Sequence, residues 1–206
     1  MRQNLKYRLL KLSPESILTF GLICAERLYP NYIAFSKANN WGEPQVLREA
    51  LDFAWKSLLE AKPADSASLE VLQQKCLANT PDADNFESYM SHGLDAACAA
   101  AYVLDFLETQ DAQNVEYIAE LCFDTVDMYL RWEYRSSYGQ EIDSLEAAEK
   151  YFALEEELMR THPLLAAETD FQKTILETVS FTHQVDQFQN LHDTWRGQTR
   201  SNLGLP

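Results

Sequence analysis

Hydrophobic positions recur every three or four residues along most of the chain, which is the spacing of one face of an α-helix. The clearest case is residues 43–61, where Leu47, Leu51 and Leu58 fall on one face. Charged side chains follow on the other face at four-residue steps, and such rows form ion pairs on a solvated surface. We therefore predict a helix here whose exposed row is Arg48, Asp52, Lys56 and Glu60.

Residues 90–108 form a second kind of segment, which is apolar on every side from Ala96 to Leu104. A helix without a polar face must be buried by its neighbours. Its many Ala residues let those neighbours approach closely. Asp84 followed by Glu87 has the spacing of a capping box, so this pair is predicted to open the helix.

Proline and capping residues divide the N-terminal region. Leu5, Leu9 and Leu12 predict a short basic amphipathic helix. Ser13-Pro14 is a helix start, with Ser as the cap and Pro at the first position. The helix that follows is expected to break or kink at Pro30, because proline removes a backbone donor.

Further helical segments are predicted in the rest of the chain from the same periodicity. The run that begins at Asp143 is interrupted at His162-Pro163. Gly139 is expected at or just beyond the end of the helix before it. The segments are centred on residues 69–79, 115–138, 143–158 and 171–188.

No stretch alternates between apolar and polar residues as a half-buried strand would. Only 6 Gly and 7 Pro are available for turns, and 46% of the residues are hydrophobic. The sequence thus predicts an all-α, single-domain bundle over residues 1–206. It contains about seven or eight helices around the central Ala-rich buried helix, and residues 196–206 form a C-terminal tail.

The charge is strongly acidic and unevenly distributed. The net charge is −15, yet residues 1–60 carry 8 Lys or Arg against 6 Asp or Glu, whereas residues 61–206 carry 9 against 26. An acidic surface repels phosphate backbones and anionic lipid, so we expect neither nucleic-acid nor membrane binding. A protein partner, including a basic one, or a homo-oligomer is compatible with this charge.

The four cysteines are far apart and form no C-x-x-C pair, which favours buried, reduced thiols over a disulfide framework or a zinc site. They are Cys24, Cys76, Cys98 and Cys122. No run reaches the ~18 apolar residues of a membrane span, and the first residues lack the apolar core of a signal peptide. A cytoplasmic location is the expectation.

Motifs for common catalytic chemistry are missing. The residues three before each histidine are Tyr89, Met159, Ser180 and Gln189, so the Glu-x-x-His pattern of di-iron bundles is absent. The sequence contains no H-E-x-x-H or G-x-S-x-G motif, and its glycines are all isolated. We assign no catalytic residue, no metal ligand and no cofactor.

The densest polar and aromatic constellation surrounds Pro30. Glu26, Arg27, Tyr29, Asn31 and Tyr32 crowd the expected helix break. One interpretation is structural, because backbone groups freed at the break need hydrogen-bond partners. The other is a small polar pocket or partner surface in which the Arg binds an anion and the tyrosines line the wall.

Three other features are considered as possible sites. Asp95 opens the apolar helix and is expected at the rim of the core or opposite a cation or donor such as Arg27; a buried carboxylate there could have a raised pKa. The acids Glu155–Glu157 predict a solvated helix face. Residues Met128–Trp132 could form a contact patch, but a core stripe ending in Arg131 is the preferred interpretation.

Several of these blocks together resemble the YjaG-like family of uncharacterised bacterial proteins, domain of unknown function 416. The matching blocks are Cys24–Tyr32 with Phe35, residues 81–84, Leu94–Cys98 with Ala100, and Ser201–Gly204. The resemblance implies a single-domain, all-helical cytosolic protein. It implies no activity and no binding residues.

Our leading hypothesis is therefore a non-enzymatic interaction or regulatory protein. The alternative is a small-ligand-binding protein or enzyme that uses a polar-aromatic pocket near Pro30, with Glu26, Arg27, Tyr29, Asn31, Tyr32 and Asp95 as its candidate residues.

Overall fold

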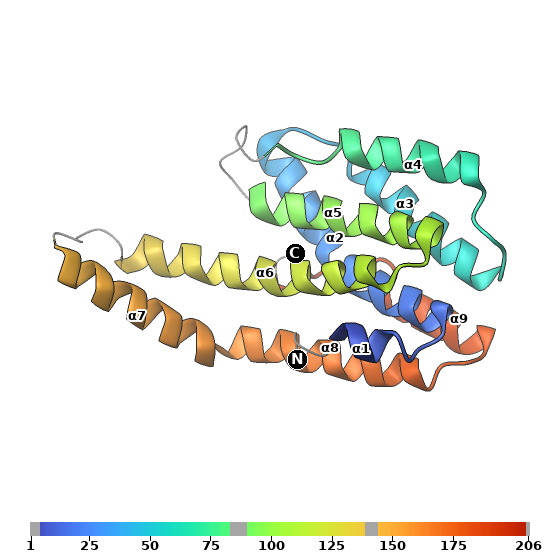
Figure 1. Cartoon of the computed structure of the whole chain (residues 1–206). Helices are drawn as coiled ribbons and strands as arrows, with labels where there is room; N and C mark the ends of the chain where they lie inside the picture. The colour runs from blue at the N-terminus through green and yellow to red at the C-terminus, as the bar shows by residue number, and fades with distance from the viewer. Residues whose placement is uncertain (1–4, 83–89, 139–143, 205–206) are drawn as a thin grey trace.

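The computed structural model describes residues 5–82, 90–138 and 144–204, and within these ranges the protein contains helices and no strands. The all-α prediction is confirmed. Asp84, Glu87, Gly139 and Asp143 lie outside the described residues. The helices are α1 (Leu5–Leu9), α2 (Pro14–Asn39), α3 (Pro44–Leu59), α4 (Ser66–Ala78), α5 (Met90–Thr109), α6 (Ala112–Tyr138), α7 (Leu145–Thr161), α8 (Pro163–Ser180) and α9 (Val185–Trp195) (Figure 1).

Helix α2 begins as its sequence predicts and ends later than expected. The Ser13 hydroxyl accepts a bond from the Ser16 amide at 3.2 Å. The last helical residue is Asn39, and Asn40 caps this end with a φ of 47°. Of the break or kink predicted at Pro30, the break is wrong, since α2 continues through this residue to Asn39. Proline deprives only one carbonyl of its helical donor. Side chains on both sides of Pro30, among them Leu28 and Phe35, are buried in the core, which favours a continuous helix.

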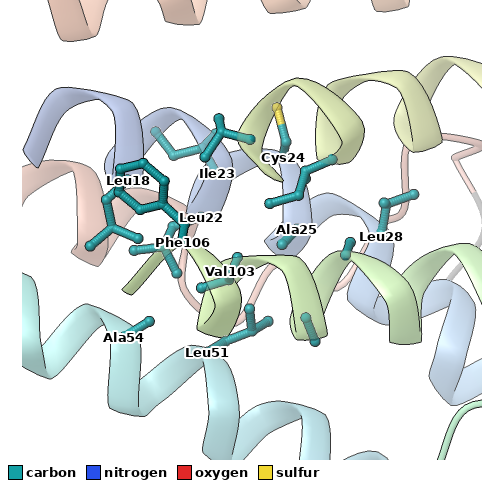
Figure 2. Close-up of a cluster of buried hydrophobic side chains, with 14 of the residues drawn as sticks. Leu18, Leu22, Ile23, Cys24, Ala25, Leu28, Leu51, Ala54, Val103 and Phe106 are labelled. Carbon is teal, nitrogen blue, oxygen red and sulfur yellow. The ribbon is translucent and has the colours of Figure 1, made fainter. Parts of the chain in front are cut away.

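Two helices share the centre of the bundle. Helix α5 packs against α2, α3, α4 and α6, and α2 packs against α3, α5, α6, α8 and α9. Figure 2 shows part of this core, with Leu22 of α2 near Val103 and Phe106 of α5. The Ala residues of α5 lie in this core as the sequence predicted. They are Ala96, Ala97, Ala99 and Ala100.

A glycine sets the distance between α2 and α5. A Cβ atom on Gly93 would lie 2.4 Å from Cγ of Phe35, so no larger residue fits there without displacing the ring. One side of α5 is only partly covered, because Asp95, Cys98 and Tyr102 retain some exposure. The helix thus belongs to the core along most of its surface and borders solvent along one edge.

The C-terminal helices differ from the prediction of one run over residues 171–188. Helix α8 ends at Ser180 and α9 begins at Val185. Gln184 is the N-cap residue of α9, and the side chain of Gln187 accepts bonds from the backbone of His183 and Gln184 at 2.8 and 3.1 Å. Glutamine is an unusual cap, so the sequence pattern did not indicate this boundary.

Helix α7 and the second half of α6 form an arm that extends beyond the other helices (Figure 1). A small cluster of buried side chains supports it, separate from the main core. The cluster consists of Val126, Leu130, Met159, Leu165 and Leu203. The part of the chain that the structure describes has no helix long and apolar enough to cross a membrane.

Two predictions about this arm are wrong in part, since Glu156 and Glu157 are exposed as predicted and Glu155 is not. Glu155 is only 1% exposed, because it faces α6 and accepts bonds from Arg135 at 2.7 Å and Arg131 at 3.3 Å. Met128 and Trp132 are 50% and 64% exposed, so they are not a core stripe. They lie on a side of α6 that none of the described helices covers fully, whereas Leu130 belongs to the arm's own core.

Candidate functional site

Five of the six candidate residues lie on the middle turns of α2, and the sixth lies on α5. Glu26 is fully buried, and its carboxylate accepts bonds from Arg48 of α3 at 2.6 and 2.7 Å. The indole of Trp55 donates a further bond at 2.9 Å. A buried carboxylate needs such partners, because its desolvation is otherwise expensive.

The position of Arg48 corrects the predicted solvated row on this helix. Arg48 is 8% exposed, because its guanidinium turns inward to meet Glu26. It also contacts Asp52 at 3.0 Å, and Arg196 binds the same carboxylate through two bonds of 2.9 Å. The ring of Tyr29 lies 5.3 Å from the Arg48 guanidinium carbon. An ion-pair chain thus runs from the core to the surface.

Arg27 pairs in a different direction, toward α8. Its guanidinium donates to Glu168 at 2.8 Å and lies 3.6 Å from the centre of the Phe171 ring. Glu168 is 2% exposed and also accepts from Gln172 at 2.9 Å. Because Leu165, Glu168, Gln172 and Ile175 follow each other at helical spacing, their periodicity was a usable sign that this acid faces the core.

Asn31 and the C-terminal tail meet beside Pro30. The Asn31 amide donates to Asn202 at 3.1 Å, and Asn202 donates to the Cys122 carbonyl at 2.8 Å. The backbone N–H of Asn202 donates to the Arg27 carbonyl at 3.2 Å. That carbonyl comes one residue after the carbonyl of Glu26, which loses its helical donor at Pro30, so the tail bonds to the turn that the proline affects.

Tyr32 is buried and reaches the end of α4. Its hydroxyl donates to the Asn79 carbonyl at 2.6 Å, and burial raises the pKa of its phenol. The Asn79 side chain accepts from the Glu43 amide at 2.7 Å, which ties the same point to the start of α3. The tyrosine therefore joins three helices and presents no wall to a cavity.

Asp95 lies apart from this group and faces α6. It accepts a bond from the Thr125 hydroxyl at 2.7 Å, so the expected pairing with Arg27 is wrong, although a donor was foreseen. Burial raises the pKa of Asp95 to about 6; the Thr125 bond lowers it in part, and the charge of Asp124 raises it further. A carboxyl with this pKa is half-protonated at about pH 6, close to neutral pH.

Four surface pockets lined by described residues do not include any of the six candidates. One pocket of about 840 Å³ lies between the start of α2, the α3–α4 connection and the end of α5, with Glu15, Gln73 and Phe106 in its wall. The others, of about 280, 430 and 180 Å³, lie along α6 and the arm.

Metal-binding groups are also absent from the described ranges, where no three His, Cys, Asp or Glu side chains converge on a common point. All four cysteines are free. Cys24, Cys76 and Cys122 are buried, and Cys98 is partly exposed. Burial raises the pKa of the Cys76 thiol to about 12, which keeps it protonated and unreactive at neutral pH.

Comparison with known proteins gives consistent matches along the whole chain. Two relatives, each named "Uncharacterized protein YjaG", come from Salmonella typhimurium and Escherichia coli K12. They are 25% and 24% identical, and each alignment covers 100% of this chain and 98% of the relative.

A crystal structure of a DUF416 family protein from Shewanella baltica has the same fold, with a TM-score of 0.76 at 23% identity. The alignment covers 98% of this chain and 97% of that one. The model of the family described as "Protein of unknown function (DUF416)" matches residues 4–206. The chain therefore belongs to the DUF416 family.

Proposed function

We propose that this protein is a non-enzymatic interaction protein that acts by binding another protein through its α6–α7 side. The observation that carries the proposal is the set of large apolar side chains exposed there. Met128, Trp132, Phe152 and Leu154 are each at least 50% exposed. Large apolar side chains exposed on both helices of one projecting arm favour an interaction site there.

The polar cluster on α2 supports the same proposal, because its side chains are already paired within the protein and this disfavours a ligand site there. Glu26, Arg27, Asn31 and Tyr32 each bond to a side chain or carbonyl of another element. A ligand that used these groups would have to replace partners that are already in place, at a cost of about 1–3 kcal/mol for each buried group left unpaired. The favoured role for this cluster is to fasten α2 to α3, α4, α8 and the tail.

The net charge favours a class of partner for such binding, and the cysteine thiols favour a cellular compartment. The acidic surface disfavours nucleic acid and anionic lipid and favours a protein partner that carries basic residues. Three buried reduced cysteines suit a reducing compartment, so we propose a cytoplasmic location.

Affinity capture with the full chain tests the proposal. The tagged protein is crosslinked in a lysate of the organism of origin, and proteins recovered with it are quantified. Separate variants change Trp132 and Phe152 to Ser, one on each helix of the arm. Leu77→Ser is the matched control, because Leu77 is 75% exposed on α4, away from the arm.

We expect one partner to be recovered in near-equal amount with the wild-type chain and with the Leu77 control. At least one of the two arm variants should recover much less. Failure to recover a partner after crosslinking, or equal recovery with all three variants, would overturn the proposal.

A further inference from the structure

A cavity of about 280 Å³ lies where α1, α6 and α8 come together (Figure 1). Its wall includes none of the six candidate residues discussed above, and neither Trp132 nor Phe152 of the arm. The cavity is therefore separate from the polar cluster on α2 and from the side chains that carry the proposed function. The residues that line it are Leu5, Glu116, Ala119, Glu120, Phe123, Thr169 and Gln172.

Helical spacing gathers these residues on the facing sides of packed helices. The four lining residues of α6 follow each other at intervals of three, one and three positions, so they share one face of that helix. Thr169 and Gln172 are three residues apart on α8, which packs against α6. Leu5 of α1, which is 4% exposed, closes another side.

Helix α1 is attached at this cavity through apolar and polar contacts. Leu5 and Leu9 are buried. Lys6 donates to the side-chain oxygen of Gln113 at 2.5 Å, and the amide nitrogen of Gln113 donates to Glu116 at 2.7 Å. Lys6 is thus linked to Glu116 through the Gln113 amide, and one oxygen of the Glu116 carboxylate is held at the cavity.

Gln172 places a buried acceptor in the cavity wall. It is 6% exposed, and its amide nitrogen donates to the Ala119 carbonyl and to the Glu168 carboxylate, at 2.9 Å each. Both of these neighbours accept hydrogen bonds, so the amide nitrogen must face them and the amide oxygen must point away. Within the described ranges no group donates to that oxygen. Because buried polar atoms normally have a partner, this oxygen is available to a ligand in the cavity.

The other polar side chains of the wall are also acceptors. Glu116 and Glu120 are partly buried and lie about one helical turn apart. Neither carboxylate forms an ion pair with a described Lys or Arg. The Thr169 hydroxyl donates to the Leu165 carbonyl at 2.9 Å, so only its acceptor capacity remains. No described Lys, Arg or His lines the cavity, which therefore offers acceptors and negative charge.

This set of groups selects a ligand by charge and by hydrogen-bonding type. An anion would be repelled, and a neutral acceptor would find no free side-chain donor. A primary ammonium group carries a positive charge and three donors, which match the three acceptor side chains Gln172, Glu116 and Glu120. The rest of the wall, which includes Leu5 and Ala119, is apolar and suits an alkyl chain.

We propose that the cavity between α1, α6 and α8 binds a small primary alkylamine in its protonated form, with Gln172, Glu116 and Glu120 around the ammonium group. A chain of about five carbons fits the volume, at about 30 Å³ for each water-sized group. This inference goes beyond the proposed function and does not depend on it.

An NMR titration of the isotope-labelled full chain tests the inference. The probe is n-pentylamine, added as its hydrochloride at neutral pH. The matched control probes are 1-pentanol and pentanoate, which have the same chain length with a neutral and a negative head group. Chemical shifts of backbone and side-chain amides give both Kd and the location of binding.

We expect saturable shift changes with n-pentylamine at the side-chain amide of Gln172 and at the backbone amides of residues 116–123. Pentanol should bind much more weakly, and pentanoate should not bind. Glu120→Gln should raise Kd at least about tenfold, because it removes a charge-assisted hydrogen bond. Gln172→Met should raise Kd as well, and circular dichroism checks that this variant is folded.

Glu177→Gln is the matched control variant. It makes the same change of charge on an exposed part of α8 outside the cavity, so Kd should stay nearly unchanged. A similar rise of Kd in the Glu120 and Glu177 variants would overturn the inference, because the amine would then respond to the net charge of the protein.

Three further results would overturn the inference. The first is absence of saturable shift changes at the Gln172 amide, and the second is equal Kd for n-pentylamine and 1-pentanol. The third is equal Kd for the wild type and the Glu120 variant. Capture of a protein partner tests Trp132 and Phe152 instead, so the proposed function and this inference stand or fail separately.

Discussion

Several buried or partly buried charges in this protein are paired with an opposite charge on another helix. Glu26, Arg27 and Glu155 each have an oppositely charged partner on another helix. The sequence did not indicate on which helix each of these partners lies. The consequences for stability can be tested by single substitutions at the most buried of these pairs.

Arg48→Met should destabilise the protein by about 3–5 kcal/mol, because it leaves the fully buried Glu26 carboxylate with Trp55 as its remaining donor. The double variant Glu26→Leu with Arg48→Met should recover most of that loss. Lys56→Met is the control. Its exposed pair with Glu60 at 3.9 Å should contribute less than about 1 kcal/mol. Urea unfolding measures all three, and a loss under about 1 kcal/mol for Arg48→Met would contradict the prediction.

Asp95 predicts a pH dependence of stability. Its pKa rises from an ordinary value of 3.8 to about 6 on folding, so the folded state disfavours the charged form. Well below the ordinary pKa of 3.8 the carboxyl is protonated in both states and there is no penalty. As the pH rises from about 4 to about 6 the penalty develops and stability falls, by roughly 2–3 kcal/mol at about 1.4 kcal/mol for each unit of pKa, and above that range the penalty stays constant.

Asp95→Asn should remove this dependence while its side-chain oxygen still accepts the Thr125 bond. Urea unfolding of both proteins at pH 4, 5, 6 and 7 measures the difference. The variant should match the wild type at the acid end and exceed it in stability at pH 7. A constant difference across this range would show that the Asp95 carboxyl does not titrate as its surroundings imply.

At the scale of elements, α2 and α5 lie as close as their small residues allow. Gly93 sits directly against the Phe35 ring, and Phe35 also packs against Tyr32 and Trp41 at ring distances of 5.7 and 5.8 Å. The ring therefore has little room to move. The isolated glycine was visible in the sequence, but the residue it faces lies far away along the chain.

Gly93→Ala should destabilise the protein by about 2 kcal/mol or more, since its new methyl group would lie 2.4–2.8 Å from atoms of Phe35. Gly21→Ala is a graded control. Its nearest neighbours are side-chain atoms of Val115 and Ile118 at 3.1–3.4 Å, so the loss should be smaller. Thermal unfolding ranks the two variants, and a reversed order would argue against close packing at Gly93.

The whole molecule consists of a large core and a less supported arm. Helix α7 packs only against α6 and α8 among the helices with substantial contact, and much of its apolar surface is exposed. Glu155 is its main polar attachment to α6. Elements with few buried contacts open more readily than the core, so the arm should unfold locally before the rest.

Glu155→Ala should increase amide hydrogen exchange throughout α7 about tenfold, because charged hydrogen bonds contribute about 1.5–3 kcal/mol each. Exchange in α2 should stay unchanged. Glu157→Ala is the control, because Glu157 pairs only with exposed Arg160 on its own helix. Mass spectrometry of peptic fragments reads both regions, and equal effects of the two variants would mean that Glu155 does not anchor the arm.

Helical periodicity determined the fold class of this protein, the approximate position of most helices and the burial of the Ala-rich helix, because these depend on residues three or four positions apart. Capping residues such as Ser13 located helix ends for the same reason. Local rules failed where distant parts of the chain meet: Asn202 of the tail bonds to the turn before Pro30, where α2 continues as one helix.

The orientation of each charged side chain was decided only by the tertiary structure. Arg48 and Glu155 look solvated in their own helices, yet each turns inward because a buried or facing partner lies on another helix. Met128 and Trp132 look like core residues, yet both are at least half exposed because none of the described helices covers them fully. A sequence pattern states which faces of a helix can be buried, and the packing of the other helices decides which of them are.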